Sequence, residues 1–399
     1  MSDILFENLG KFEYAADDSS QKELESEYLN HYIKSSTQIN DKNAWKNRGF
    51  GASFRSDEAN DDQAKKNIQA AVNGIALAED GEFFYSITVN EMSGIFRKSI
   101  TAAKDSETHV IHASDMEFYD VDYSRKSRLL AASLKSDSFA QNIALFDLQQ
   151  GDYHILTDGD SMDRHPYFSQ SRPNTVLFDS SGIGRDSSGN FVEYGPASLY
   201  RIDTLTNQIE ELASREGVSF VCPKDDVEGN LYYIERPAKY KEKKPNILLE
   251  ILLIPFKIIY AIYRFLEAFT MLFTGKTFTS NTSGNNPARN RNEREIFIEG
   301  NLIEAEKNLK KSRKRGEKFP GIAPQSWKLM LRRPDGESET LMNGVIAFDL
   351  DDEGNLIFTN GKNVLLRKKN GSVEKISDAS LCRHVSAYHG ETQVNYSIF

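Results

Sequence analysis

Short apolar segments alternate with turns rich in acidic residues and glycine along most of this 399-residue chain. At three places an apolar segment ends in such a turn and an aromatic-rich segment follows. These places are Ile75–Gly81 before Glu82–Val89, Cys222–Gly229 before Asn230–Ile234, and Phe348–Gly354 before Asn355–Thr359. Apolar and aromatic runs bounded by turn residues are typical of β-strands. Repetition of such runs every ~40–50 residues predicts the four-stranded blades of a β-propeller.

The repeat divides the chain into units and predicts how the ring closes. The units are 72–112, 115–157, 162–213, 217–342 with a large insertion, 344–377, and a partial unit from Arg383. The partial unit offers two strands, Val385–Tyr388 and Gln393–Phe399, and the N-terminus offers Ile4–Asn8 and Lys11–Tyr14. Joining both ends in one blade removes the exposed sheet edges. We therefore predict an all-β, six-bladed propeller with a two-plus-two closure; seven blades would require strands within 45–60.

Blades two and three carry a more specific pattern. It consists of Leu156-Thr-Asp-Gly-Asp160, then Asp163-Arg-His-Pro-Tyr-Phe-Ser169, then Thr175-Val-Leu-Phe-Asp-Ser180. This pattern resembles the repeat of TolB-like six-bladed propellers, in which a strand ending in Leu-Thr leads into Pro-x-aromatic-Ser. It departs from that family at Ser169–Asn174, where the usual Pro-Asp-Gly turn is missing. The resemblance implies a fold and not a function.

Two segments do not fit the blades. One is a polar extension, for which we predict a helix at Ser20–Lys34 and which also contains the aromatic and basic stretch Trp45–Arg55. The other is an insertion in blade four. The predicted organisation is 1–14 (closing strands), 15–70 (extension with a helix), 71–237 (first blades), 238–325 (membrane-interacting helical insertion) and 326–399 (remaining propeller).

The insertion contains the one long apolar run of the chain, Ile247–Phe273. Its charges Glu250, Lys257 and Arg264 recur every seven residues, so on a helix they form a narrow polar stripe. The other faces are apolar. The side chains expected to enter a membrane are Ile251, Leu252, Phe256, Ile258, Ile259, Ile262, Phe265, Leu266, Phe269, Leu272 and Phe273.

Three interpretations of this run compete. A helix buried against the propeller would have to cover an outer face. A transmembrane span would place Lys257 and Arg264 in the bilayer at ~2.5–3.5 kcal/mol each. It would also separate the two parts of blade four. An amphipathic or re-entrant helix returns to the same side and is the interpretation we favour.

Basic residues flank the apolar run. Those expected to bind anionic lipid are Lys241, Lys243, Lys244, Lys310, Lys311, Arg313, Lys314 and Arg315. Each Lys or Arg near an anionic leaflet gains about 1 kcal/mol, and apolar insertion combined with a basic patch gives stable anchoring. The alternative for the second cluster is an ordinary solvated helix, because its spacing is helical and glutamates precede it.

The charge distribution supports this division of the chain. The whole chain carries 49 Lys and Arg against 59 Asp and Glu, a net charge of −10. Residues 239–318 hold 17 basic and 9 acidic residues, a local +8, which leaves −18 for the rest. Net acidity argues against a nucleic-acid partner. Two cysteines and a first segment without the basic n-region and apolar h-region of a secretory signal predict a cytoplasmic protein, peripheral or monotopic on the inner face of the membrane.

Motifs for catalysis are not found in the sequence: it has no G-x-S-x-G, H-E-x-x-H, P-loop or C-x-x-C. We therefore predict no catalytic residue and no cofactor. Strand alternation should put His109 and His112 on opposite faces, which argues against a shared metal. Asp158, Asp160 and Asp163 are expected in one loop between blades.

One longer loop, Ser180–Ser198, is a candidate for contacting a partner through Gly182, Gly184, Arg185 and Tyr194. Together these features predict a membrane-associated propeller that acts as a protein-binding scaffold. The alternative is a propeller enzyme, of the lactonase or glycosidase type, with a cation in the central channel. For that alternative, acidic, Asn or His side chains from several blades should converge on the axis; a scaffold predicts no such convergence.

Overall fold

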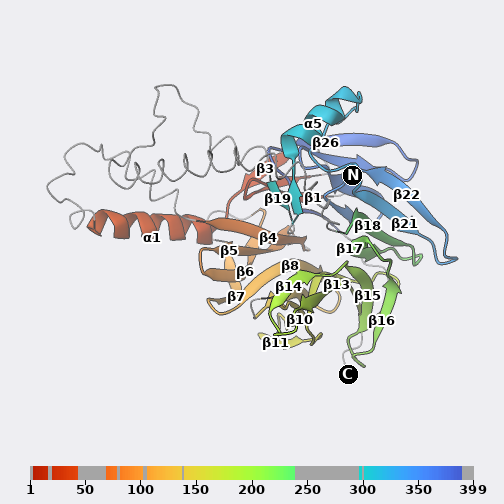
Figure 1. Cartoon of the computed structure of the whole chain (residues 1–399). Helices are drawn as coiled ribbons and strands as arrows, with labels where there is room; N and C mark the ends of the chain where they lie inside the picture. Colours follow the sequence, from red (N-terminus) through yellow and green to blue (C-terminus); the bar gives the residue numbers. More distant parts are fainter. Residues whose placement is uncertain are drawn as a thin grey trace, which may run out of the picture. The chain divides into compact units, whose positions relative to one another are not determined.

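The computed structural model describes residues 3–16, 20–43, 69–78, 81–101, 106–136, 139–238, 296–298 and 301–388. Within them the chain forms two compact units. The larger unit comprises 1–238 and 305–399, and it holds six antiparallel sheets, each built as a propeller blade. Figure 1 shows these blades in sequence colours. The smaller unit, 239–304, contains the two-stranded sheet of β19 (Ile296–Ile298) and β20 (Asn301–Ile303).

Blades one to three follow the predicted units, with the innermost strand first in the chain. Blade one consists of β4 (Ala70–Leu77), β5 (Glu82–Val89), β6 (Met92–Ser99) and β7 (Thr108–Ala113). Blade two consists of β8 (Glu117–Ser124), β9 (Leu129–Lys135), β10 (Asn142–Asp147) and β11 (Asp152–Ile155). Blade three consists of β12 (Ser161–Phe168), β13 (Thr175–Arg185), β15 (Ser198–Asp203) and β16 (Ile209–Ala213), with β14 (Phe191–Tyr194) paired to the end of β13.

Blades four and five continue this order. Blade four consists of β17 (Val218–Asp225), β18 (Leu231–Pro237), β21 (Lys328–Arg332) and β22 (Ser338–Asn343), and the insertion lies between its second and third strands. Blade five consists of β23 (Ala347–Leu350), β24 (Leu356–Thr359), β25 (Asn363–Arg367) and β26 (Val373–Asp378). The prediction of a six-bladed propeller is confirmed.

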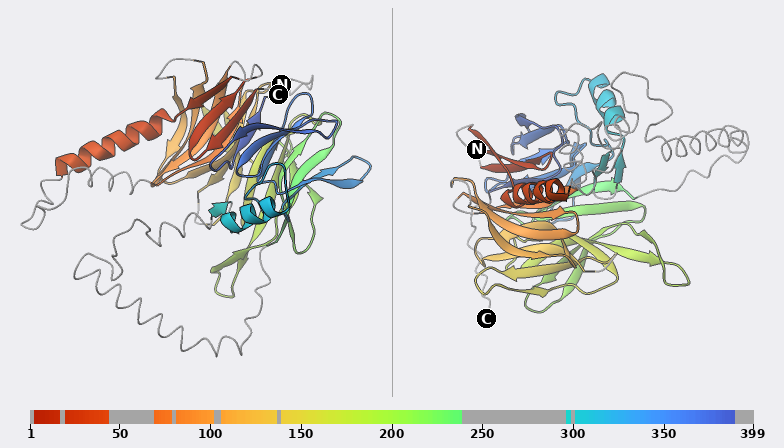
Figure 2. Two further views of the ribbon diagram at one scale, coloured as in Figure 1. Left: turned by 90° about the horizontal axis from the view of Figure 1, so that it is seen from above. Right: turned by 90° about the vertical axis from the view of Figure 1, so that its left-hand side faces the viewer.

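Blade six joins the two ends of the chain, but not with the predicted two-plus-two closure. It consists of β27 (Val385–Ala387), β1 (Ile4–Asn8), β2 (Lys11–Ala15) and β3 (Gln21–Leu24). Ile4 pairs with Ala387, and Figure 2 shows the red N-terminal strands beside the blue C-terminal ones. The closure therefore uses three N-terminal strands and one C-terminal strand. The expected strand Gln393–Phe399 lies outside the described residues.

The third N-terminal strand also corrects the predicted helix at Ser20–Lys34. Helix α1 spans Glu27–Asn43, and Gln21–Leu24 pairs with β2 instead. Ser26 caps the helix, because its Oγ accepts the Leu29 N–H at 3.0 Å. Residues before such a cap stay extended, and Leu24 then buries its side chain in blade six.

Apolar cores lie between neighbouring blades. Phe12 of blade six packs on Phe83 and Tyr85 of blade one, with ring centroids 5.2 and 4.7 Å apart. The innermost strands of consecutive blades contact one another around the whole ring, including β27 with β4. Between blades three and four the buried cluster is small and consists of Leu199, Phe220 and Tyr233.

Helix α5 (Ala305–Lys314) is the described helical part of the insertion. Among the described residues, no helix is long and apolar enough to cross a membrane. The apolar run Ile247–Phe273, the lysines Lys241, Lys243 and Lys244, and the stretch Trp45–Arg55 lie outside the described residues.

Candidate functional sites

The innermost strands of blades one to four share an irregularity at the same level. Each carries a bulge, at Asn73, Asp120, His165 and Cys222 respectively. Three of these residues have a positive φ: 33° for Asp120, 50° for His165 and 56° for Cys222. This conformation costs a non-glycine residue about 1–2 kcal/mol, and the surrounding structure must hold it in place. The bulges aim polar groups across the seams between blades.

The seam between blades two and three is joined by a partly buried ion pair. Arg164 donates to Asp120 through Nε at 2.9 Å and Nη2 at 3.0 Å. His165 continues the cluster: its Nδ1 lies 2.6 Å from Asp179 Oδ1, and its Nε2 lies 3.7 Å from Asp120 Oδ1. Asp179 Oδ1 also accepts the backbone N–H of Cys222 in blade four at 2.9 Å. One polar cluster therefore links three consecutive blades.

A second cluster continues around the ring. Lys224 of blade four pairs with Asp349 of blade five at 2.6 Å, and the ammonium lies 4.9 Å from the centroid of the Tyr167 ring. Asp349 Oδ2 accepts the N–H of Ala387 in blade six at 2.9 Å. Burial raises the pKa of the Tyr167 hydroxyl well above its usual range, so this side chain stays neutral. The axial carboxylates are thus matched by cations and backbone donors.

Polar side chains from several blades do meet near the innermost strands, which the sequence predicted only for the enzyme alternative. Within the described ranges, however, no group of three or more His, Cys, Asp or Glu side chains is placed to hold a metal ion. The arrangement holds blades together by charge-assisted hydrogen bonds, which are stronger than neutral ones.

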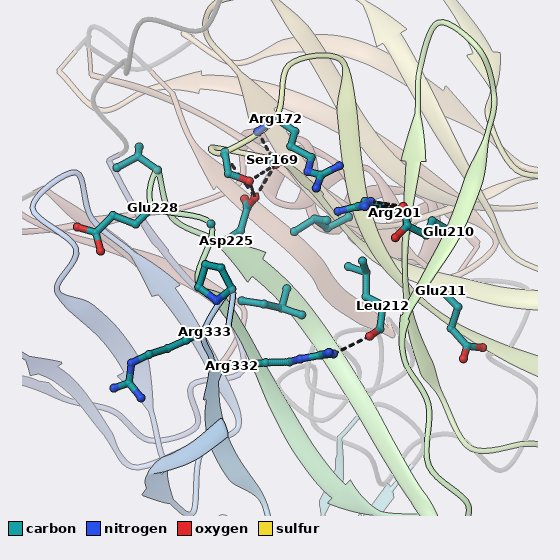
Figure 3. Close-up of a pocket in the computed structure, with 16 residues that line it drawn as sticks. Ser169, Arg172, Arg201, Glu210, Glu211, Leu212, Asp225, Glu228, Arg332 and Arg333 are labelled. Carbon is teal, nitrogen blue, oxygen red and sulfur yellow. Dashed lines mark hydrogen bonds and ion pairs between the residues drawn. The ribbon is translucent and has the colours of Figure 1, made fainter. Parts of the chain in front are cut away.

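A polar cleft of about 640 Å³ opens at the seam between blades three and four, where the apolar cluster is small (Figure 3). Arginines line it from both blades. Arg201 donates through Nε to Glu210 at 2.9 Å, and Arg332 donates through Nη1 to the carbonyl of Leu212 at 2.7 Å. Arg172 is exposed and has no side-chain partner among the described residues. Such guanidinium groups suit a carboxylate or phosphate ligand.

One wall of this cleft is built around Asp225, at the end of β17. Its carboxylate accepts hydrogen bonds from Ser169 Oγ at 2.5 Å, from the backbone of Gln170 at 2.7 Å, and from both the backbone and the hydroxyl of Ser171. Burial nevertheless raises the pKa of Asp225. The turn that departs from the TolB-like pattern therefore supplies the donors for a carboxyl of the next blade.

Helix α5 presents a basic outer face. Its inner face is fixed to the propeller, because Asn308 Nδ2 donates to the Ile322 carbonyl at 3.0 Å and Ser312 Oγ accepts the Gly321 N–H at 3.2 Å. The exposed cations on and just after the helix are Lys307, Lys310, Lys311, Arg313, Lys314, Arg315 and Lys318.

Part of this basic face is neutralised locally. Lys310 pairs with Glu306 at 2.6 Å and Arg315 with Glu317 at 2.6 Å. For Lys311, Arg313 and Lys314, the described part of the chain shows no acidic partner. These three side chains are therefore available to an anionic surface.

The predicted partner loop is a hairpin and not a loop. Gly182, Gly184 and Arg185 lie in β13, and Tyr194 lies in β14. Arg185 donates a hydrogen bond to Asp160, and this bond lowers the pKa of the Asp160 carboxyl. Tyr194 donates its hydroxyl to the Phe139 carbonyl at 2.8 Å. The apolar pattern did not predict that β13 extends through Ser180–Arg185, because these residues have little apolar character.

Two further site predictions need correction. Asp163 does not lie in an inter-blade loop; it lies in β12, is buried, and accepts the Ser180 hydroxyl at 2.6 Å. His109 and His112 do not lie on opposite faces of their strand. Their Nδ1 atoms are 3.3 Å apart, because a bulge in β7 shifts the alternation.

The comparisons with known proteins agree with the fold and go no further. No family model matches the sequence, and no curated protein matches it. TolB from Acinetobacter baumannii is 10% identical with a TM-score of 0.48, over 97% of this chain and 66% of that one, so this chain spans about two thirds of its length.

Two further solved structures are similar. A putative TolB from Agrobacterium tumefaciens is 12% identical over 78% of this chain and 83% of that one, with a TM-score of 0.40. A putative gluconolactonase is 9% identical over 80% and 84%, with a TM-score of 0.41. The chain is a six-bladed β-propeller protein. Its function is not set by these likenesses.

Proposed function

We propose that this protein docks on an anionic membrane surface and acts there as a binding scaffold for a protein partner. The observation that carries the proposal is the outer face of α5, where Lys311, Arg313 and Lys314 are exposed without acidic partners in the described residues. Each such cation near an anionic leaflet contributes about 1 kcal/mol. The apolar run Ile247–Phe273, which precedes α5 in the sequence, supplies the second anchoring signal.

The strand topology supports one orientation for the proposed docking. The insertion follows β18 and the hairpin follows the main part of β13. The segment after α5 is tied to the loop after β24, because Asn360 Nδ2 donates to the Phe319 carbonyl. Strands β13, β18 and β24 are each the second strand of their blade. The second strands of all blades run in the same direction relative to the propeller axis. The α5 surface and the hairpin therefore belong to one face of the ring, which would be the membrane-facing one.

The cleft between blades three and four belongs to the opposite face. Its walls include turns that follow first and third strands, at Ser169–Arg172, Val227–Gly229 and Arg333–Pro334. We assign the protein partner to this cleft, through an anionic segment that meets Arg172 and Arg332. A contact at Gly182, Gly184, Arg185 and Tyr194 stays a prediction, and so does a location on the cytoplasmic side.

Vesicle flotation of the full chain and of a variant lacking 245–275 tests the proposal. With vesicles containing phosphatidylserine, the full chain should float and the deletion should lose at least 10-fold of the bound fraction. Circular dichroism must first show the same β signal for both proteins. Equal flotation of the two proteins would contradict the proposal.

The enzyme alternative has one specific observation in its favour, which is the meeting of Asp120, His165 and Asp179 from two blades. In the structure, however, Asp120 is paired with Arg164, and Asp179 accepts the backbone N–H of Cys222. A bound divalent cation found by elemental analysis, and lost together with activity in D120N, would favour this alternative over the scaffold.

A further inference from the structure

His109 and His112 lie on β7, the outermost strand of blade one. His109 pairs with Phe96 and His112 with Gly94 in the register with β6, and a bulge at Val110 accounts for the odd spacing. Their partners are two residues apart on β6, so both imidazoles project from the same face of the sheet. The bulge thus creates a pair that strand alternation alone would forbid.

Gly94 provides the space for this pair. A Cβ at Gly94 would lie 2.9 Å from the Ile111 carbonyl oxygen and 3.0 Å from His112 Cβ. Any side chain there would push β7 away or displace His112. On the other side, the His109 ring packs edge-on against Phe96, with centroids 4.8 Å apart, and against Tyr28 of α1 at 6.1 Å. The pair is therefore held by the fold while both rings remain exposed to solvent.

The geometry points to a site for a divalent transition cation of the zinc class, bound by Nδ1 of His109 and Nδ1 of His112. Zinc–nitrogen bonds of ~2.0–2.1 Å at a tetrahedral angle place two ligand nitrogens about 3.3 Å apart. The two Nδ1 atoms are 3.3 Å apart in the structure. With the protons on Nε2, both Nδ1 lone pairs become available, and imidazole is a preferred ligand for Zn²⁺, Cu²⁺ and Ni²⁺.

Among the described residues the site offers two protein ligands, and water would complete the coordination. Neither Cys222 nor Cys382 competes for the ion, because both thiols are buried. A bound cation would fix the His109 ring against Tyr28, and thereby hold the first turn of α1 on blade one. Binding should therefore be visible both in solution titrations and in the protection of α1.

Titration of the untagged full chain with zinc chloride at pH 7.5, by calorimetry, tests the site. The native protein should bind one equivalent, and H112A and H109A should each weaken that binding at least 10-fold. The matched controls are H31A and H154A, which remove other exposed histidines and should leave the binding unchanged.

EPR of the copper-loaded protein is a second measurement, and it reports the number of bound imidazole nitrogens and not the stability of the variants. The EPR spectrum of the Cu²⁺-loaded protein should show coupling to two imidazole nitrogens in the native protein and in H31A, and to one in H112A. Zinc should also slow amide exchange in residues 27–32 of the native protein but not of H112A. Native-like zinc affinity in both H109A and H112A, or the absence of saturable binding to the native protein, would overturn the proposal.

Discussion

Asp225 shows how single residues connect the blades of this ring. It is buried at the end of an innermost strand, and donors from Ser169, Gln170 and Ser171 in the preceding blade surround it. Burial is the largest influence and raises its pKa. Asp203 is the opposite case, because the N–H groups of Thr206 and Leu205 lower its pKa. The two carboxyls should therefore affect stability with opposite sign as the pH changes.

We expect D225N and D203N to differ from the native protein in opposite ways between pH 3.5 and 7. Native Asp225 holds its proton to higher pH than the unfolded chain, so its contribution to the free energy of unfolding falls as pH rises. Native Asp203 releases its proton at lower pH, so its contribution is present above the unfolded pKa and is lost as pH falls. Urea unfolding at several pH values measures both. A stability gap between the native protein and D225N that widened with pH would contradict this assignment.

At the scale of elements, the position of α5 depends on the segment that follows it. Phe319–Ala323 returns over the loop of blade five, where Ile322 and Ala323 both donate their N–H groups to the Asn360 carbonyl. Asn360 Nδ2 donates in turn to the Phe319 carbonyl at 2.9 Å. Gly361 allows this approach: its φ is +87°, and a Cβ would lie 2.4 Å from Ile322 Cγ1.

The substitution G361A should therefore lower the free energy of unfolding by about 2–4 kcal/mol, since it adds overpacking to an unfavourable φ. G371A is the matched control. Gly371 has a φ of +85° with no atom within 4 Å of a Cβ, so only the φ penalty of about 1–2 kcal/mol applies. Denaturant unfolding compares the two variants, and equal losses would show that α5 is not seated as described.

The elements also show what the sequence can and cannot predict. The regular spacing of apolar segments was sufficient to predict blades one to five, because apolar alternation and acidic-glycine turns are local signals. It was insufficient at Gln21–Leu24, a polar edge strand whose pairing with β2 is decided by the tertiary structure. The bulges at Asp120, His165 and Val110 have no local signal either, and they determine which polar side chains meet. The axial ion pairs and the histidine pair were therefore not predictable from the sequence.

At the scale of the whole molecule, polar links cross the seams around the ring. Asn73 Nδ2 donates to the Phe118 carbonyl at 3.1 Å between blades one and two, and Ser386 Oγ accepts the Leu77 N–H at 2.9 Å between blades six and one. The ion pairs of Asp120 and Asp349 join blades two and three and blades four and five. Hydrogen bonds from Cys222 to Asp179 and from Ala387 to Asp349 join blades three and four and blades five and six. These carboxylates are thus paired within the ring, whereas Lys311, Arg313 and Lys314 on α5 have no acidic partner among the described residues.

That contrast leads to the most direct test of the proposed function. We expect the full chain to bind phosphatidylserine vesicles at low salt and to weaken as the salt concentration rises, because exposed charges are screened. The triple variant K311E/R313E/K314E reverses the charge of the cations without acidic partners and should lose at least 10-fold in affinity. The control K368E/K369E/K375E reverses three exposed or partly exposed lysines of blade five, outside the loop that seats α5. It should remain within 2-fold of the native affinity. Equal loss in both variants, or native-like binding by the α5 variant, would contradict the account.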